Sequence, residues 1–340
     1  MPLVVLAQPL PVFTWAVDHP CFSTFLLALG AFSFARFAAK TAVVFAQTFL
    51  LSGISLKKFG AKKGAWAVVT GASSGIGKEF AIQLAKAGFN VLVAARSASS
   101  LSETVTEISA GSDTQTKIVT IDLSKDDEAA YGAFAAACEG LDIGVLVNNA
   151  GKSHEMPTDF AETSKEEMED ILAINTKAVL KITSIVVPGM VQRRRGLILN
   201  IGSFAGALPS PMLATYSASK AFLSTFSGAL GEELKPHGIT VEHVNTYFVV
   251  SNMSKIRRPT PLIPTPASFV RAVLSKIGRP CGAAFTGRPH TSTPFWSHAL
   301  IDWAMNVAGW KGVFVGYTHG LHESIRKRAL RKKEREAKKL

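Results

Sequence analysis

The sequence predicts an α/β fold: a doubly wound parallel sheet with an apolar N-terminal membrane anchor and a basic amphipathic C-terminal extension. Three observations lead to this prediction. Strand-like and helix-like segments alternate through the middle of the 340-residue chain, as is typical of parallel sheets with helices on both faces. A glycine-rich turn joins the first strand of this region to its first helix. Charge is nearly absent from the first 56 residues and concentrated in the last 15.

The start of the chain is the expected membrane anchor. Three runs lack Asp, Glu, Lys and Arg entirely, namely residues 1–17, 19–35 and 41–56. We predict one span over about residues 20–40, whose Arg36 and Lys40 reach the cytosolic headgroups. The run 41–56 would then lie in the interface, unless both later runs form a tight hairpin. Lysines at residues 57–63 favour a cytosolic position for the domain that follows.

An alternation of strands and helices begins at residue 65. Strands are predicted over 65–70, 89–95, 117–121 and 143–147, with helices near 75–87, 98–110 and 125–139 between them. A longer helix is predicted over Thr163–Arg193. Strands that alternate with helices pair in parallel, because each helix carries the chain back across a face of the sheet. The three cysteines are far apart and form no metal-binding spacing with histidine.

The turn after the first strand predicts a dinucleotide-binding site. Its sequence over residues 71–77, GASSGIG, opens the first helix. Gly71, Gly75 and Gly77 allow the backbone to turn tightly and to approach a pyrophosphate. The helix N-terminus offers free N–H groups and the positive end of its dipole to the same phosphates.

The end of the second strand favours NADPH over NADH. An Asp or Glu at this place would accept hydrogen bonds from the adenosine ribose. The chain has Ala94 and Ala95 here, followed by Arg96, whose guanidinium can pair with a 2′-phosphate. Asp122, after the third strand, is expected to receive the adenine amino group. Residues 148–151 (NNAG), after the fourth strand, are expected to line the cofactor cleft and to brace the sheet.

A tyrosine and a lysine on one helical face predict the chemistry of the site. Tyr216 and Lys220 are four residues apart, and Tyr216 follows Ser203 by thirteen residues. An ammonium beside the phenol would lower the tyrosine pKa from about 10 toward neutrality. A tyrosine with such a pKa can exchange a proton with a carbonyl oxygen near pH 7.

In order and spacing, these motifs resemble the short-chain dehydrogenase/reductase family. The resemblance covers roughly residues 64–250 and includes the TGxxxGxG form of the glycine turn. It implies a Rossmann-type sheet and an oxidoreductase in which Tyr216 protonates the substrate oxygen as hydride arrives from the nicotinamide. Lys220 would lower the tyrosine pKa and hold the nicotinamide ribose. Ser203 would orient the carbonyl, and Asn175 would hold a water that links Lys220 to solvent.

The same resemblance implies a set of cofactor-binding residues and a domain organisation. The cofactor-binding residues are Gly71, Ser73, Ser74, Gly75, Ile76, Gly77, Arg96, Asp122, Asn149, Tyr216, Lys220 and Val249. The expected parts of the chain are an anchor (1–56), a catalytic domain (64–290), and a membrane-associated helix with a basic tail (291–340).

The segment after the sixth strand carries a narrower resemblance. Residues 247–259 (YFVVSNMSKIRRP) are similar to the microsomal very-long-chain 3-oxoacyl-CoA reductases, as are residues 57–64 and 268–278. Thr246 departs from the proline that is usual in that branch. These enzymes reduce 3-oxoacyl-CoA to 3-hydroxyacyl-CoA with NADPH, in the second step of fatty-acid elongation. They act at the cytosolic face of the endoplasmic reticulum.

The narrower resemblance also implies partners. These are a very-long-chain 3-oxoacyl-CoA substrate, the endoplasmic reticulum membrane, and other elongation enzymes: the condensing enzyme, the dehydratase and the enoyl reductase. A basic loop that contains Lys255, Arg257 and Arg258 is expected to engage either the CoA phosphates or lipid headgroups.

The end of the chain is apolar and then basic. Residues 295–315 suit an interfacial or re-entrant helix because they have few charges and carry Phe295, Trp296, Trp303 and Trp310. Nine Lys and Arg against two Glu in residues 326–340 supply +7 of the formal +12. This run lacks interleaved aromatic residues, so anionic lipid headgroups suit it better than nucleic acid.

Two other functions fit the same motifs. A membrane-bound 17β-hydroxysteroid dehydrogenase, or another reductase of hydrophobic ketones, would use the same frame. Pocket residues within 247–290 would decide between these substrates. A cofactor-binding membrane scaffold without turnover is the alternative outside enzymes, and it would not need Ser203, Tyr216, Lys220 and Asn175 together.

Overall fold

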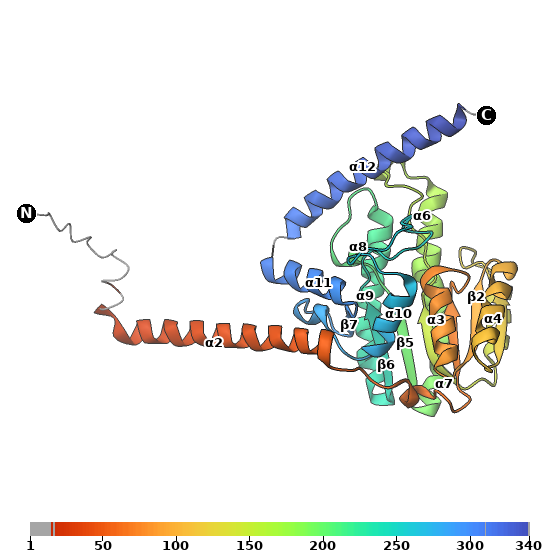
Figure 1. The fold of residues 1–340 in the computed structure, drawn as a ribbon, viewed down its shortest axis with the longest axis horizontal. Coiled ribbons are helices and arrows are strands. Elements are labelled where there is room, and N and C mark those ends of the chain that lie inside the picture. Colours follow the sequence, from red (N-terminus) through yellow and green to blue (C-terminus); the bar gives the residue numbers. More distant parts are fainter. Residues whose placement is uncertain (1–14, 16–17, 310, 339–340) are drawn as a thin grey trace, which may run out of the picture.

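The computed structural model describes residue 15 and residues 18–309 and 311–338. Most of the predicted charge-free run 1–17, and Trp310, lie outside these residues. Among the described residues, seven parallel strands form one sheet in the order β3-β2-β1-β4-β5-β6-β7 (Figure 1). The strand order reverses between β1 and β4, where a doubly wound sheet opens a crevice at the carboxyl ends of its strands.

The four predicted strands are confirmed to within one residue at each end. The strands are β1 (Trp66–Thr70), β2 (Asn90–Ala95), β3 (Thr116–Thr120), β4 (Ile143–Asn148), β5 (Gly196–Ile201), β6 (Ile239–Val244) and β7 (Thr291–Ser292). Every residue of β1, β4 and β5 is buried. Continuous apolar runs of this kind are expected when helices cover both faces of a parallel sheet.

Helices cover both faces of the sheet. One layer contains α3 (Gly75–Lys86), α4 (Ala98–Gly111) and α10 (Pro266–Ser275), and the other contains α5 (Glu128–Cys138), α7 (Ala178–Arg193) and α9 (Ala214–Leu234). Neighbouring strand residues point to opposite faces, so Val69 packs with the first layer and Val68 with the second. Both residues are fully buried, and the core therefore lies on the two sides of the sheet.

The predicted helix over Thr163–Arg193 is present, with an irregular middle. It consists of α6 (Lys165–Leu172), a π-helical turn η4 (Ala173–Lys177) and α7, which follow one another without a break. The Ser164 side chain accepts a hydrogen bond from Glu167 N and thereby caps the first turn. A π-helical turn of this kind is often found at functional sites, and this one contains Asn175.

The apolar N-terminus forms one helix and not a hairpin. Helix α2 (Pro20–Phe45) continues through the π-helical turn η1 (Ala46–Leu50) and projects from the domain that contains the sheet (Figure 1). By length and composition, Pro20–Leu50 is long and apolar enough to cross a membrane. Lys165–Arg193 passes the same test, but much of it is buried in the core.

The second apolar run, residues 41–50 of α2 and η1, contacts the rest of the protein. Its residues Val44 and Thr48 are buried, and Thr41 Oγ1 accepts a 3.4 Å hydrogen bond from Trp303 Nε1. Phe45 packs edge-on against the same tryptophan ring. Val43, Phe49 and Leu50 are exposed, so one side of the run packs on the protein and its interfacial placement stays a prediction.

An extended linker then fixes α2 to the domain that contains the sheet. Gly53 N donates to Ser275 O at 2.7 Å, and Ile54 N donates to Ile277 O at 2.8 Å. A Cβ atom at Gly53 would lie only 2.3 Å from Ile277 N, so the two backbones need glycine to approach this closely. Helix α2 and the domain are therefore joined by paired backbone, in addition to side-chain contacts.

The aromatic segment after residue 290 differs from the prediction. It contains β7 and helix α11 (Trp296–Ala308), which packs on the domain through the short 3₁₀ helix Gly282–Phe285. The buried face of α11 carries Asp302, which accepts hydrogen bonds from Asn245 Nδ2 and Thr293 Oγ1. A helix with a buried carboxylate and these partners belongs to the core. The folded domain therefore extends past residue 290.

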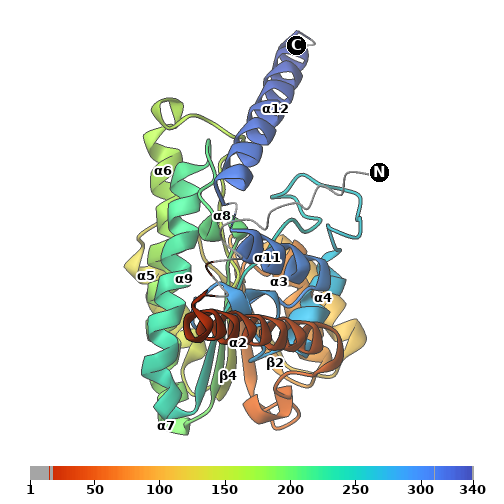
Figure 2. The same cartoon turned by 90° about the vertical axis from the view of Figure 1, so that its left-hand side faces the viewer.

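The basic end of the chain forms the long helix α12 (Lys311–Ala337). Figures 1 and 2 both show α12 starting near α11 and running away from α2, so that its basic end is far from the proposed membrane span. This direction does not favour the expected contact between residues 326–340 and the same lipid surface.

Candidate active site

Four predicted catalytic side chains come together beyond the carboxyl ends of β4 and β5. Ser203 follows β5 and begins the one-turn helix α8 (Phe204–Ala207), where its Oγ accepts from Ala205 N at 3.2 Å. Tyr216 and Lys220 lie on consecutive turns of α9. Asn175 approaches from the π-helical turn η4. The sequence spacing thus predicted a real cluster, built from three separate elements.

Tyr216 and Ser203 are joined by a side-chain hydrogen bond. Burial raises the pKa of Tyr216, and the hydrogen bond with Ser203 opposes this rise only in part. The expected fall of the tyrosine pKa toward neutrality is therefore wrong for the protein alone. The phenol is fully protonated at pH 7, which is the form that a proton donor needs.

Lys220 is buried beside this tyrosine. Its Nζ donates a 2.9 Å hydrogen bond to Ile201 O at the end of β5 and lies 5.8 Å from the centre of the Tyr216 ring. Burial lowers the pKa of Lys220 to about 8, because the charged ammonium has lost most of its water. At pH 7 the side chain is still mostly protonated.

Asn175 fastens the loop after β4 to helix α9. Its Oδ1 accepts from Lys152 N at 2.8 Å, and its Nδ2 donates to both Lys152 O and Ser219 Oγ at 2.9 Å. A Cβ atom built on Gly151 would lie 3.4 Å from Asn175 Oδ1 and 3.6 Å from Lys220 Nζ. The two polar atoms therefore border one small space, and glycine keeps it open. The predicted water-holding role of Asn175 stays a prediction.

The glycine turn has the geometry expected of a phosphate site. Gly71 and Gly75 have positive φ angles of 65° and 56°, which favour glycine. A Cβ atom on Gly77 would lie 2.2 Å from Gly71 O and 2.4 Å from Asn149 Nδ2. Helix α3 begins at Gly75, and Ser74 makes no side-chain cap with the described residues. The first N–H groups of α3 are thus free of a side-chain cap and suited to an anion.

Asn149, the first residue after β4, braces the turn. Its Nδ2 donates to Thr70 O at 3.0 Å and to Gly71 O at 3.2 Å. Asn148 braces the sheet as predicted, since its Nδ2 donates to Thr183 Oγ1 and Asn200 Oδ1. Direct contact between Asn149 and a cofactor stays a prediction, as it does for Ser73 and Ile76 of the turn.

Arg96 and Asp122 lie together at the other end of the candidate cofactor site. Arg96 is exposed directly after β2. Burial acts to raise the pKa of Asp122, but hydrogen bonds from Ser124 and the nearby charge of Arg96 outweigh it, so the pKa is lowered. An exposed guanidinium beside an ionised carboxylate fits the predicted recognition of an adenosine 2′-phosphate and an adenine amino group.

Val249 is one of the buried residues among those predicted to bind the cofactor. Its side chain is buried in the core, and its carbonyl accepts a 2.7 Å hydrogen bond from Ser254 Oγ. Any cofactor contact through Val249 would have to use its backbone.

Sequence reasoning missed three residues that hold the site together. Thr70 Oγ1 accepts hydrogen bonds from Asn149 N and Ala150 N, both at 3.1 Å, and so ties β1 to the loop after β4. Ser219 Oγ accepts a hydrogen bond from Asn175 Nδ2. His243 packs against Gly202, where a Cβ atom would lie 2.1 Å from its Nε2. Thr70 had a signal, since it opens the glycine motif, whereas Ser219 and His243 had none.

The described residues fit a dinucleotide along the carboxyl edge of the sheet. The glycine turn and the start of α3 suit the phosphates, Arg96 and Asp122 suit the adenosine end, and Lys220 borders the space at Gly151. A partly buried tyrosine–serine pair lies beside that space. This arrangement can bind a nicotinamide cofactor and place a proton donor next to a substrate carbonyl.

Comparison with known proteins assigns the family. The short chain dehydrogenase family matches residues 65–261, and the chain belongs to this family. Among curated relatives, the very-long-chain 3-oxoacyl-CoA reductase of Coprinopsis cinerea is 61% identical over 94% of this chain and 95% of its own. The reductase of the same name from Aspergillus oryzae is 52% identical over 92% of this chain and 90% of its own.

Solved structures support the same assignment. A short-chain dehydrogenase from Sphingobium yanoikuyae, in complex with NADPH, is 26% identical and superposes with a TM-score of 0.60. The match covers 74% of this chain and 95% of the chain of that dehydrogenase. A 7β-hydroxysteroid dehydrogenase has a TM-score of 0.67 over 78% of this chain and 99% of its own, but at 22% identity it supports the fold alone.

Proposed function

We propose that this protein reduces very-long-chain 3-oxoacyl-CoA to 3-hydroxyacyl-CoA with NADPH. The observation that carries the proposal is 61% identity, over nearly the whole chain, to a reductase of that name. The cluster of Ser203, Tyr216, Lys220 and Asn175, in which Lys220 and Asn175 are buried, supplies the groups that carbonyl reduction needs. The choice of NADPH is supported by exposed Arg96 after β2 and by the NADPH complex of a structural relative.

The residues of the chain divide the chemistry between them. NADPH, when bound, supplies the hydride that the carbonyl carbon receives. Tyr216 gives its hydroxyl proton to the carbonyl oxygen, so that C=O becomes CH–OH. Ser203 shares a hydrogen bond with Tyr216, and its hydroxyl can stabilise the developing oxyanion.

Lys220 and Asn175 support the proton donor in this scheme. The Lys220 ammonium lies near the Tyr216 ring and stabilises the phenolate that is left after proton transfer. Asn175 Oδ1 accepts one hydrogen bond, from Lys152 N, and keeps the capacity for a second. Because Oδ1 and Lys220 Nζ border the same space at Gly151, a water between them can return a proton to the site.

We place the enzyme at the endoplasmic reticulum membrane, with its catalytic domain in the cytosol. Residues 20–36 of α2 are exposed almost throughout and largely apolar. At ~1.5 Å per residue this segment is about 26 Å long, close to the thickness of a bilayer core. Its very-long-chain substrate favours the same location, and the condensing enzyme, dehydratase and enoyl reductase of elongation are the proposed neighbours.

The basic loop after β6 is the proposed contact for the CoA phosphates. Lys255 Nζ donates to Glu155 O at 2.6 Å, while Arg257 and Arg258 are exposed. We therefore expect the two arginines to carry most of the effect. Replacing all three basic residues with alanine should raise the KM for acyl-CoA several-fold, and an unchanged KM would remove the loop from the proposal.

The proposed substrate is tested with the purified full-length protein in detergent. NADPH oxidation should follow addition of a long-chain 3-oxoacyl-CoA, with much lower activity on a steroid ketone and with NADH. Higher kcat/KM for the steroid ketone would replace the acyl-CoA proposal with the hydroxysteroid alternative. Cofactor binding without turnover of either substrate would favour a scaffold.

A further inference from the structure

Two loops that flank the active site are hydrogen-bonded to each other. One loop follows β4 and spans residues 151–162, and the other spans residues 208–213 between α8 and α9. Thr158 N of the first loop donates to Met212 O of the second at 2.8 Å. Met212 has a positive φ of 65°, an uncommon backbone conformation for a side chain of its size. A contact that holds either loop therefore acts on both.

Helix α12 holds the second loop through a buried histidine. His322 is 5% exposed, and its Nδ1 donates a 2.7 Å hydrogen bond to Pro211 O. Burial lowers the pKa of His322, so the ring is neutral at pH 7 with its proton on Nδ1. Pro211 lies in the short connection between Ser203 and Tyr216. The histidine thus contacts the backbone that sets the separation of the two catalytic residues.

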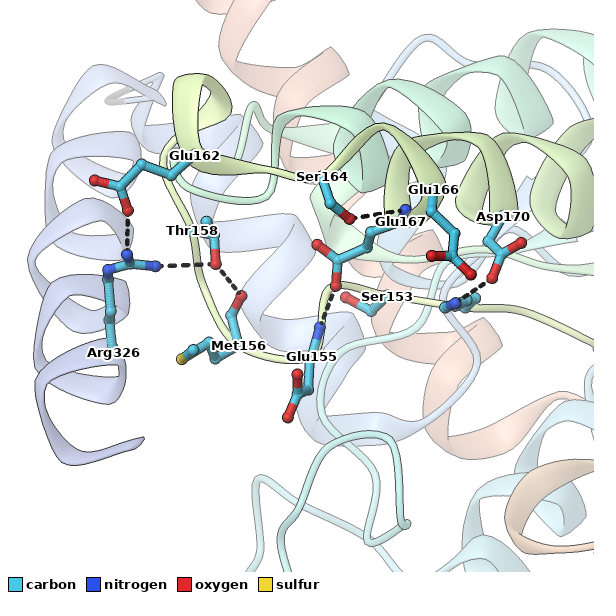
Figure 3. Close-up of a pocket in the computed structure, with 11 residues that line it drawn as sticks. Ser153, Glu155, Met156, Thr158, Glu162, Ser164, Glu166, Glu167, Asp170 and Arg326 are labelled. Carbon is cyan, nitrogen blue, oxygen red and sulfur yellow. Dashed lines mark hydrogen bonds and ion pairs between the residues drawn. The ribbon is translucent and has the colours of Figure 1, made fainter. Parts of the chain in front are cut away.

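One turn later, α12 holds the first loop through an arginine. Arg326 Nη1 donates to Pro157 O and to Thr158 Oγ1, both at 3.0 Å. Its Nη2 forms an ion pair with Glu162. Figure 3 shows Arg326 reaching from α12 to Glu162 and Thr158, at one end of a cavity of about 620 Å³. A guanidinium with three partners on one loop fixes that loop far better than a single exposed ion pair.

His322 and Arg326 are four residues apart and therefore lie on one face of α12. The loops that they hold follow β4 and β5. By contrast, the glycine turn, Arg96 and Asp122 belong to the half of the sheet that contains β1, β2 and β3. Contacts from α12 therefore reach the substrate side of the site and not the predicted phosphate and adenosine sites.

We propose that α12 is a strap that positions both active-site loops for substrate binding, with His322 and Arg326 as its positioning residues. The inference rests on the proposed carbonyl reductase function. Neither residue touches the reacting atoms. They act through Pro211 and Thr158, which fix the loops beside Ser203 and Tyr216.

The test compares His322→Ala and Arg326→Ala with matched controls on the same helix. His319→Ala and Lys327→Ala make similar changes at exposed positions. Each strap variant should raise the KM for long-chain 3-oxoacyl-CoA about three- to tenfold, as expected for the loss of one or two hydrogen bonds. The kcat and the KM for NADPH should change less than twofold. His322→Asn keeps a donor near the Nδ1 position and should restore most of the loss.

Hydrogen exchange of the full-length protein gives a readout that needs no turnover. The Thr158 amide should exchange faster in both strap variants than in the controls, while amides of β4 and β5 keep their protection. Unchanged exchange at Thr158, or an unchanged acyl-CoA KM, would overturn the strap. So would a parallel rise in both KM values with a lower melting temperature, since that indicates only a structural role. A wild type inactive on acyl-CoA, with faster Thr158 exchange in the variants, would contradict the substrate and leave the strap standing.

Discussion

At the scale of single residues, burial controls the chemistry of the site. The same loss of water that raises the pKa of Tyr216 lowers the pKa of Lys220 to about 8. Both shifts favour the neutral form, so at pH 7 the tyrosine keeps its proton and the lysine is close to losing its own. The sequence predicted that the two residues are neighbours, but their depth below the surface is a property of the packed fold.

The pKa of Lys220 predicts a pH dependence of activity. Above about pH 8 the ammonium loses its proton and no longer stabilises the tyrosinate, so kcat/KM for reduction should fall with a limb near that pH. In Lys220→Arg the charge persists at all accessible pH values, and the limb should disappear from the residual activity. Wild-type kcat/KM that stays constant from pH 7 to 9 would contradict the assignment.

The same pKa predicts how stability changes with pH. The folded-state pKa of Lys220 lies below its usual value of 10.5, so between about pH 8 and 10.5 the unfolded chain binds more protons than the folded chain. The contribution of Lys220 to the free energy of unfolding therefore rises with pH in this window. Lys220→Met should lack this rise in denaturant titrations, and an identical pH slope in both proteins would refute it.

At the scale of elements, the glycine turn and its supporting strand were predictable, and the supporting hydrogen bonds were not. Motif spacing placed Gly71, Gly75 and Gly77 before a helix, because a tight turn needs glycine wherever it occurs. The motif spacing placed Asn149 at the cofactor cleft, but it did not show that the Asn149 amide binds the turn from the end of β4. The π-helical turn at Asn175 was likewise hidden, since its residues have ordinary helical propensities.

A substitution in this turn tests its role in cofactor binding. In Gly77→Ala the new Cβ would collide with Gly71 O and Asn149 Nδ2, so the turn must move away from its present geometry. We expect the Kd for NADPH to rise at least about tenfold, or 1.4 kcal/mol, in a fluorescence titration.

Gly132→Ala is the matched control for this change. It lies inside α5, where nothing comes within 4 Å of the new Cβ. The control should leave the Kd unchanged and raise stability by about 0.5–1 kcal/mol, because alanine suits a helix interior better than glycine. Equal NADPH affinity in the two variants would remove the turn from the cofactor site.

At the scale of the whole molecule, the anchor and the domain form one connected unit. The sequence predicted an apolar N-terminus but assigned residues 41–56 and 295–315 to lipid, because apolar side chains suit a bilayer and a protein surface equally well. In the structure these segments contact each other, with Trp303 against Thr41 and Phe45, while Phe49, Leu50 and Trp296 are exposed. Composition cannot distinguish such mutual packing from membrane contact.

Two truncations test this organisation. Removal of residues 1–36 leaves Phe37, whose ring packs edge-on against Phe285, and all later contacts. This form should lose binding to lipid vesicles in sedimentation but keep a melting temperature near that of the full chain. Removal of residues 1–55 also deletes the Trp303 contacts and the paired linker, and should lower the melting temperature by several degrees. Equal melting temperatures for both forms would contradict the docking of α2.

The most direct test of the proposed reduction is Tyr216→Phe in the full-length protein. The change removes one hydroxyl and leaves the partly buried ring, so NADPH binding and the melting temperature should stay close to those of wild type. In a single turnover with NADPH and a long-chain 3-oxoacyl-CoA, the rate of 3-hydroxyacyl-CoA formation should fall at least about 100-fold, the usual contribution of a general acid. Product formation at the wild-type rate would contradict the assignment of Tyr216 as the proton donor and, with it, the account of this site.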